Sequence, residues 1–86
     1  RNSVNFPEMF MARNGGYRVC IVNENVPNML GQISTCMADA GLNILDMLNK
    51  SRGEIAYTLV DVDSVLSARC LEQIAAIDGV LNVRSL

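Results

Sequence analysis

The chain has 86 residues, half of them apolar, and a formal net charge of −2. A chain of this length forms one domain that buries only about 60% of the surface exposed by its unfolded state, so burial against a partner would add stability. The charges are scattered and form no basic patch, which argues against nucleic acid or an anionic membrane surface as partners. The apolar runs are too short for a transmembrane helix or a signal peptide. We therefore expect a soluble domain.

The sequence contains no histidine. This removes imidazole metal ligands, Ser-His and Cys-His nucleophile pairs and the commonest general base. The pair Gly15-Gly16 is isolated and matches neither nucleotide-binding glycine pattern. Carboxylates that could suggest a hard-metal site are not gathered in one loop, so we interpret them as solvated groups of strands and turns; they are Asp46, Asp61 and Asp63. We expect no catalytic residue and no metal site in this chain.

The sulfur-containing side chains are interpreted as structural. The cysteines are odd in number and widely spaced among apolar neighbours, which favours buried, reduced thiols of a cytoplasmic protein over a disulfide or a reactive thiol; they are Cys20, Cys36 and Cys70. Three methionines sit among apolar neighbours in predicted elements and are expected in the core, namely Met29, Met37 and Met47.

The first half of the chain reads as an arm, a strand and a helix. Residues 1–16 are predicted to be a linker arm, because proline, asparagine and glycine interrupt any regular period. Residues 17–23 are β-rich and apolar on both faces, which predicts a central strand. A helix is expected over about residues 27–40, with Pro27 at its start, apolar residues at helical spacing and Gly41 as its stop.

The second half reads as a hairpin and a further helix. Residues 43–50 and 54–62 are extended segments on either side of a turn at Ser51-Arg52-Gly53, which predicts an antiparallel hairpin. Ser64 is a plausible N-cap for a second helix with an apolar stripe, which Asp78-Gly79 ends.

Residues 80–86 complete the order βαββαβ over residues 17–86 as the last strand. This order predicts an α+β fold of the ferredoxin-like type, a four-stranded antiparallel sheet with both helices on one face. Because the first and third strands are apolar on both sides, the open face or an edge is expected to meet another subunit or domain. We expect a homodimer joined edge to edge through the first strand and first helix.

A polar turn between the first strand and first helix is the candidate binding site. Helix N-termini offer unpaired N–H groups and a positive dipole end, so a turn with Asn23 and Asn25 could hold the carboxylate and amine of a small amino acid. Two plainer interpretations stay open. Asn23, Asn25 and Asn28 could be ordinary turn and cap residues, and Asn43 could satisfy a helix end.

Residues 17–86 resemble the ACT domain, a small-molecule-binding regulatory module with the same element order. Three segments make the chain similar to the C-terminal end of the bacterial D-3-phosphoglycerate dehydrogenase family: Val4-Asn5-Phe6-Pro7-Glu8, Gly15-Gly16-Tyr17-Arg18 and Asn23-Glu24-Asn25-Val26-Pro27. The resemblance implies a parent oxidoreductase of serine biosynthesis whose upstream catalytic domains use NAD, with no catalysis in this segment itself.

The resemblance further implies that two ACT domains pair into one continuous sheet and bind L-serine at their interface, which lowers the activity of the catalytic domains. Carried over by position, the family's first-turn ligands fall on Asn23 and Asn25, and the asparagine reaching across from the partner falls on Asn43. The family commonly has histidine at position 23 and glycine at position 28, so this chain offers an amide that cannot become charged and a narrower turn. The expected ligand-binding residues are Asn23, Asn25, Asn28, Met29, Leu30 and Asn43.

Two alternatives have the same fold. The chain could be a ligand-free ACT dimerisation module, or the ACT portion of another serine-handling enzyme such as L-serine dehydratase.

Overall fold

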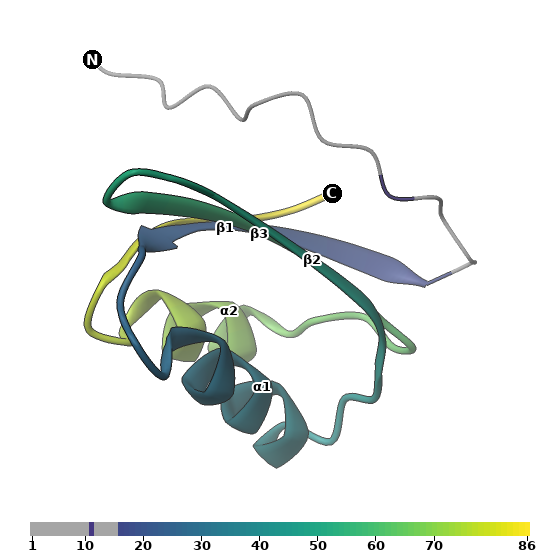
Figure 1. The fold of residues 1–86 in the computed structure, drawn as a ribbon. Helices are drawn as coiled ribbons and strands as arrows, with labels where there is room; N and C mark the ends of the chain where they lie inside the picture. Colours follow the sequence, from purple (N-terminus) through teal and green to yellow (C-terminus); the bar gives the residue numbers. More distant parts are fainter. Residues whose placement is uncertain (1–10, 12–15) are drawn as a thin grey trace.

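A computed structural model of the chain describes Met11 and residues 16–86. Two helices cover one face of a single sheet (Figure 1). In chain order the elements are β1 (Tyr17–Glu24), α1 (Met29–Asp39), β2 (Ile44–Arg52), β3 (Ile55–Val62), α2 (Ala68–Ala75) and β4 (Val80–Ser85). The sheet order is β2-β3-β1-β4, and all neighbours are antiparallel. The predicted fold is confirmed, while the predicted arm of residues 1–16 lies outside the described residues apart from Met11 and Gly16.

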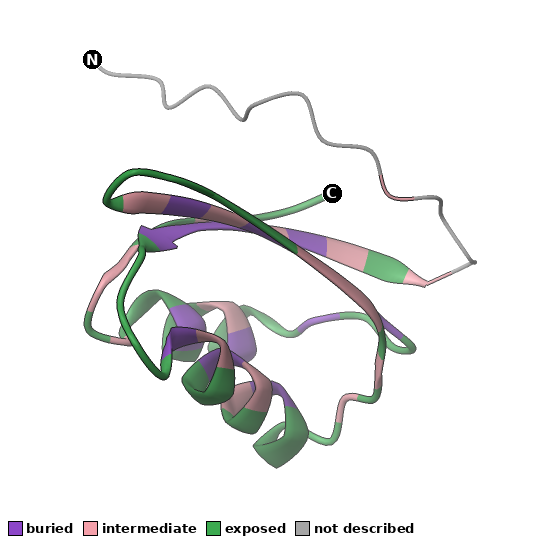
Figure 2. Ribbon diagram, viewed as in Figure 1, coloured by how far each residue is buried: buried purple, intermediate pink, exposed green. Residues whose placement is uncertain are grey.

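The core lies between the helices and the sheet (Figure 2). Alternation along β1 directs Val19 and Ile21 toward the helices, where both are fully buried. α1 contributes Ile33 and Met37 at helical spacing, and α2 contributes Ile74. Met29 also belongs to this cluster and Met47 packs against it, so the methionines are core residues as expected.

β1 is the central strand, paired with β3 on one side and β4 on the other. The predicted dimer joint through the first strand is therefore wrong, because neither edge of β1 is free to accept another strand. The two edges of the sheet are β2 and β4. A partner that extends the sheet would have to add to one of these.

Both helices begin later than the sequence predicts. α1 begins at Met29 rather than near residue 27, because Asn28 has a left-handed backbone with φ of 67° that a continuous helix cannot include. α2 begins after Ser67, whose side chain accepts a hydrogen bond from the backbone N–H of Cys70 at 3.1 Å. Ser64 is not the N-cap; its hydroxyl donates to Asp63 instead, and the intervening chain buries Leu66 before the helix starts.

The predicted hairpin is present, with a later turn. Ser51 and Arg52 remain paired with Ala56 and Ile55, so β2 continues to Arg52 and the turn falls at residues 53–54. Gly53 has φ of 62°, a left-handed conformation that suits glycine in a tight turn.

The interpretation of Asp61 as a solvated carboxylate is wrong. Asp61 is 2% exposed and pairs with Arg18, which the β1–β3 register places directly opposite it. Asp63 is exposed and Asp46 is half-buried. The three cysteines form no disulfide; Cys70 is buried, whereas Cys20 and Cys36 are only half-buried. Within residues 16–86, neither helix has the length and apolar content needed to cross a membrane.

Candidate functional site

The loop from β1 to α1 is tied to the β2–β3 turn. The backbone N–H of Asn25 donates to the carbonyl of Glu54 at 2.8 Å, and its side-chain N–H donates to the carbonyl of Gly53 at 3.2 Å. These bonds hold the loop beside the turn although Asn25 is itself exposed. Within the described part of the chain, no hydrogen bond uses the amide oxygen of Asn25, so this oxygen can accept one from a ligand.

The N-terminus of α1 opens beside this loop. Asn28 precedes the helix in the left-handed conformation, and its side chain makes no capping hydrogen bond. The first helical bond runs from the N–H of Gln32 to the carbonyl of Asn28 at 3.1 Å. The N–H groups of Met29 and Leu30 belong to the first turn, where an α-helix provides no partner, and no acidic side chain lies in that turn. This end of the helix can therefore bind a carboxylate.

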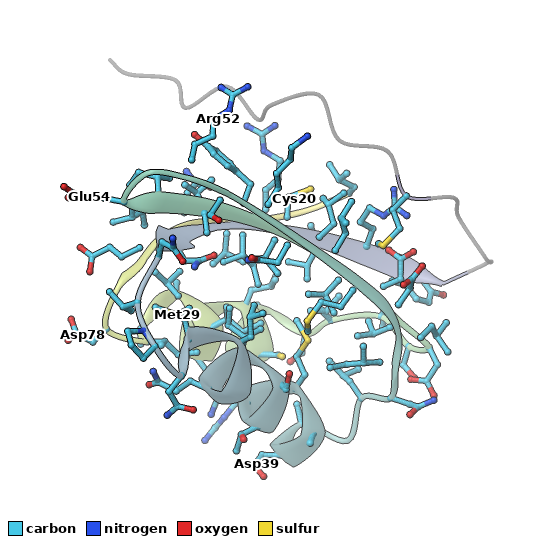
Figure 3. All side chains as sticks on the ribbon, in the orientation of Figure 1. Cys20, Met29, Asp39, Arg52, Glu54 and Asp78 are labelled. Atoms are coloured by element: carbon cyan, nitrogen blue, oxygen red, sulfur yellow. The ribbon has the colours of Figure 1, made fainter. Side chains whose placement is uncertain are left out.

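A cavity of about 230 Å³ lies at this junction. Five of the six predicted ligand residues line it, namely Asn23, Asn25, Asn28, Met29 and Leu30. Figure 3 labels Met29 at the start of α1, between the helix and the sheet. The remaining lining residues, which the sequence analysis did not single out, are Val26, Gly31, Asn49 and Ala56.

Asn23 forms part of the cavity floor and is almost completely buried. Its side-chain oxygen accepts a hydrogen bond from the Thr58 hydroxyl at 3.0 Å, and its side-chain N–H donates to the carbonyl of Glu24 at 2.9 Å. The Thr58 hydroxyl in turn accepts from the amide of Asn49 at 2.9 Å. Polar residues at strand positions that face a helix layer are the signal that could have identified Thr58 and Asn49, because a buried polar group requires a partner.

Asn43 does not line the cavity of its own chain. It precedes β2, and its backbone exchanges hydrogen bonds with Asp63: its N–H donates to the carboxylate at 3.0 Å, and its carbonyl accepts from the N–H of Asp63 at 3.0 Å. The cavity lies near the other end of β2, where Asn25 contacts Gly53. The structure thus brings together all predicted site residues except Asn43.

A second, larger cavity of about 550 Å³ lies between the helices. It shares Asn28 and Gly31 with the first cavity and is otherwise lined by Gln32, Thr35, Cys36, Asp39, Gln73 and Ile77. Burial raises the pKa of the Cys36 thiol, with a smaller contribution from Asp39, so this sulfur is not an activated nucleophile. Among the side chains that the structure describes, no group of three or more His, Cys, Asp or Glu could hold a metal ion.

The chain is similar in sequence to D-3-phosphoglycerate dehydrogenases. It is 29% identical to the enzyme of Escherichia coli over 87 aligned residues, covering 99% of this chain and 21% of the relative. It is 31% identical to the Haemophilus influenzae enzyme over 86 residues, again covering 99% of this chain and 21% of the relative. The chain therefore spans about one fifth of the length of these curated relatives. No family model matches it.

Solved structures show the same fold. The ACT domain from GTP pyrophosphokinase of Chlorobium tepidum superposes with a TM-score of 0.69 at 18% identity, over 81% of this chain and 95% of that domain. The regulatory subunit of aspartate kinase from Thermus thermophilus gives a TM-score of 0.63 at 11% identity, over 80% of this chain and 50% of that subunit. The chain thus has the fold of an ACT domain and is homologous to the C-terminal region of D-3-phosphoglycerate dehydrogenases.

Proposed function

We propose that this chain is the amino-acid-binding regulatory module of a D-3-phosphoglycerate dehydrogenase and that its effector is L-serine. The observation that carries the proposal is the cavity of about 230 Å³, which gathers the predicted ligand residues beside the N-terminus of α1. The proposal rests on this arrangement together with the homology to the named enzymes.

The size and charge of the cavity support a small zwitterionic ligand. At about 30 Å³ for each water-sized unit, the space suits a molecule of roughly seven non-hydrogen atoms, which is the size of serine. The volume is below the range of about 300 to 1,000 Å³ typical of sites for drug-sized molecules. No charged side chain is among the described residues that line it, so a ligand with a net charge would lack a counter-ion.

The ligand's carboxylate would accept hydrogen bonds from the N–H groups of Met29 and Leu30 at the positive end of α1. Its hydroxyl would contact Asn25, whose amide is held at the cavity by Gly53. These roles require no group to change its charge. They are binding roles, and we assign oxidoreductase chemistry and NAD binding to parts of the relatives that this chain does not match.

Self-association along β2 would complete the site. In a two-fold pair of antiparallel edge strands, the start of one strand lies beside the end of the other. Asn43 stands at the start of β2, and the cavity lies near its end. Pairing β2 with the β2 of a second copy would therefore bring the partner's Asn43 toward this cavity, and a ligand held by both copies would stabilise their paired geometry.

Titration calorimetry of the chain with L-serine tests the proposal. We expect binding, and we expect Asn25→Ala and Asn43→Ala each to weaken it roughly 5- to 150-fold, because a bound polar group loses its partner. Asn82→Ala is the matched control, since Asn82 is an exposed asparagine of β4 outside the cavity. The absence of heat with millimolar serine would favour a ligand-free dimerisation module.

The relatives are metabolic enzymes by name, and we place the parent protein in the cytoplasm as an enzyme of serine biosynthesis. Binding of serine that survives both alanine substitutions would place the site elsewhere on the domain. A parent activity of L-serine dehydratase would overturn the assignment to phosphoglycerate dehydrogenase while leaving the amino-acid site intact.

A further inference from the structure

A hydrogen-bond relay crosses three strands beside the cavity; it is buried at Asn23 and Thr58 and reaches the surface at Asn49. The Asn49 amide on β2 donates to the Thr58 hydroxyl on β3, and that hydroxyl donates to the Asn23 oxygen on β1. The register explains the alignment, because Thr58 is paired with Asn49 on one side and with Ile21 on the other, next to Asn23 on the same face. Thr58 is fully buried, so its hydroxyl has no access to water.

The direction of this relay is determined at its β1 end. The Glu24 carbonyl can only accept, so Asn23 must direct its NH₂ group toward it and its oxygen toward Thr58. Thr58 has a single hydroxyl proton, which it gives to Asn23, so Asn49 must donate to Thr58. The Asn49 NH₂ group therefore donates to Thr58 on β3. The amide oxygen of Asn49, a residue that lines the cavity, stays available to accept a hydrogen bond.

We infer that Asn49 is a ligand-binding residue, an inference that rests on the proposed function. Its amide oxygen accepts a hydrogen bond from the ammonium group of the bound amino acid. Thr58 is the positioning residue that orients the Asn49 side chain. No carboxylate is among the described residues that line the cavity, so the side-chain acceptors for the ligand's positive group are amide oxygens. Asn28 precedes the N-terminus of α1, where the carboxylate is expected to bind, and is therefore less suited to the ammonium group. The oxygen of Asn23 is already used by Thr58. The Asn25 side chain makes one exposed hydrogen bond of 3.2 Å, whereas the Asn49 side chain makes a part-buried one of 2.9 Å to Thr58, whose own bond to Asn23 is buried.

This assignment separates the two charged ends of the ligand. The carboxylate meets the first turn of α1, and the ammonium meets Asn49 on the edge strand β2. An amino acid would be preferred over the same acid without its amino group, because only the amino acid supplies a donor at the position that Asn49 faces. The ligand class is thus a small α-amino acid with a neutral side chain.

The test compares L-serine with 3-hydroxypropanoate, which has the same skeleton without the ammonium group. Calorimetry on the full chain should show that Asn49→Leu lowers L-serine affinity about ten- to a hundredfold, to near that of 3-hydroxypropanoate. The affinity for 3-hydroxypropanoate should change little. Asn25→Ala should lower both affinities and leave their ratio unchanged.

Two further variants separate positioning from structure. Thr58→Ser keeps the hydroxyl and should keep the wild-type ratio, whereas Thr58→Val removes the relay and should lower it. Combining Thr58→Val with Asn49→Leu should lower the ratio no further than Asn49→Leu alone, because both act on one interaction. If Thr58→Val does not fold, the affinity ratio of Asn49→Leu still tests whether Asn49 binds the ammonium group, with Thr58→Ser as the variant that should keep the wild-type ratio.

The outcomes distinguish this inference from the proposed function. Wild-type chain that binds L-serine, combined with an unchanged ratio in Asn49→Leu, overturns the role of Asn49 and leaves the amino-acid site standing. Wild-type chain that gives no heat with L-serine overturns both.

Discussion

The Arg18 guanidinium and the Asp61 carboxylate form a two-point ion pair across β1 and β3, with Nε to Oδ1 at 2.7 Å and Nη2 to Oδ2 at 2.9 Å. The pair lies on the sheet face opposite the helices, because the neighbouring Val19 and Val60 face the core. Arg18 Nη2 also donates to the carbonyl of Met11 at 2.7 Å. The hydrogen bond from Asp61 raises the pKa of Arg18, so the guanidinium stays charged.

Asp61→Asn should destabilise the fold by about 3 kcal/mol, the lower end expected when one partner of a buried pair is removed. Urea unfolding followed by circular dichroism measures the change. Glu72→Gln is the control, because Glu72 is an exposed residue of α2 and its substitution should change stability by less than about 0.5 kcal/mol. Equal effects of the two substitutions would contradict a structural role for the pair.

The Asn28 side chain and Gly31 are in close contact, since a Cβ added to Gly31 would lie 2.6 Å from the Asn28 side-chain oxygen. Alanine is the better helix former by up to about 1 kcal/mol, but Gly31→Ala should gain less than this because the Asn28 side chain must turn aside. In the Asn28→Gly background the contact is gone and glycine suits the left-handed backbone, so Gly31→Ala should stabilise more. Thermal unfolding of the four variants checks this coupling, and equal effects of Gly31→Ala in both backgrounds would refute it.

Pairing of β2 with a second copy should be visible in amide hydrogen exchange. The N–H groups of β2 that point away from β3 should be protected at concentrations where sedimentation shows a dimer, and should lose that protection on dilution. The outer N–H groups of β4 are the internal control and should exchange at every concentration. Protection of β4 in place of β2 would mean that two copies pair through β4, and the partner's Asn43 would then not reach the cavity.

Ligand binding should be independent of pH between about 6 and 8. The chain has no histidine, and none of the described residues that line the cavity has an ionisable side chain. Calorimetry with L-serine at several pH values measures this. A tenfold change in affinity within that range would mean that an ionisable group contacts the ligand.

Folding stability should fall at alkaline pH because of Cys70. Burial raises the pKa of this thiol above its ordinary value of 9.0, with a smaller contribution from Cys36. Below pH 9.0 the thiol is protonated in both states; above it the unfolded chain ionises first, so stability is lost as pH rises through the folded pKa. The loss is at most about 1.4 kcal/mol per pH unit for one thiol. Denaturant unfolding of wild type and Cys70→Ala should show a shallower alkaline slope in the variant, and parallel slopes would contradict this.

The order of the elements could be predicted from the sequence because hydrophobic periodicity is a local property. The β-rich run of β1, apolar on both faces, and the helical spacing in α1 are each encoded within one short segment. The polar turn with Asn23 and Asn25 was recognisable for the same reason, since a strand that runs into a helix start places free N–H groups there. The helix starts were less predictable, because the left-handed conformation of Asn28 and the choice of Ser67 as N-cap depend on how the loops cross to the helix layer.

Only the tertiary structure decided which residues meet across the sheet. Strand order makes β1 central and β2 an edge, and register pairs Arg18 with Asp61. The same register aligns Asn49, Thr58 and Asn23 into a relay and leaves Asn43 far from the cavity of its own chain. Arg18 and Asp61 are 43 positions apart, and Asn23 and Thr58 are 35 apart; side-chain hydrogen bonds of this range depend on strand pairing that no local pattern records. A polar residue on a strand therefore shows in the sequence only as a break in apolar alternation, and its partner is known once the sheet is assembled.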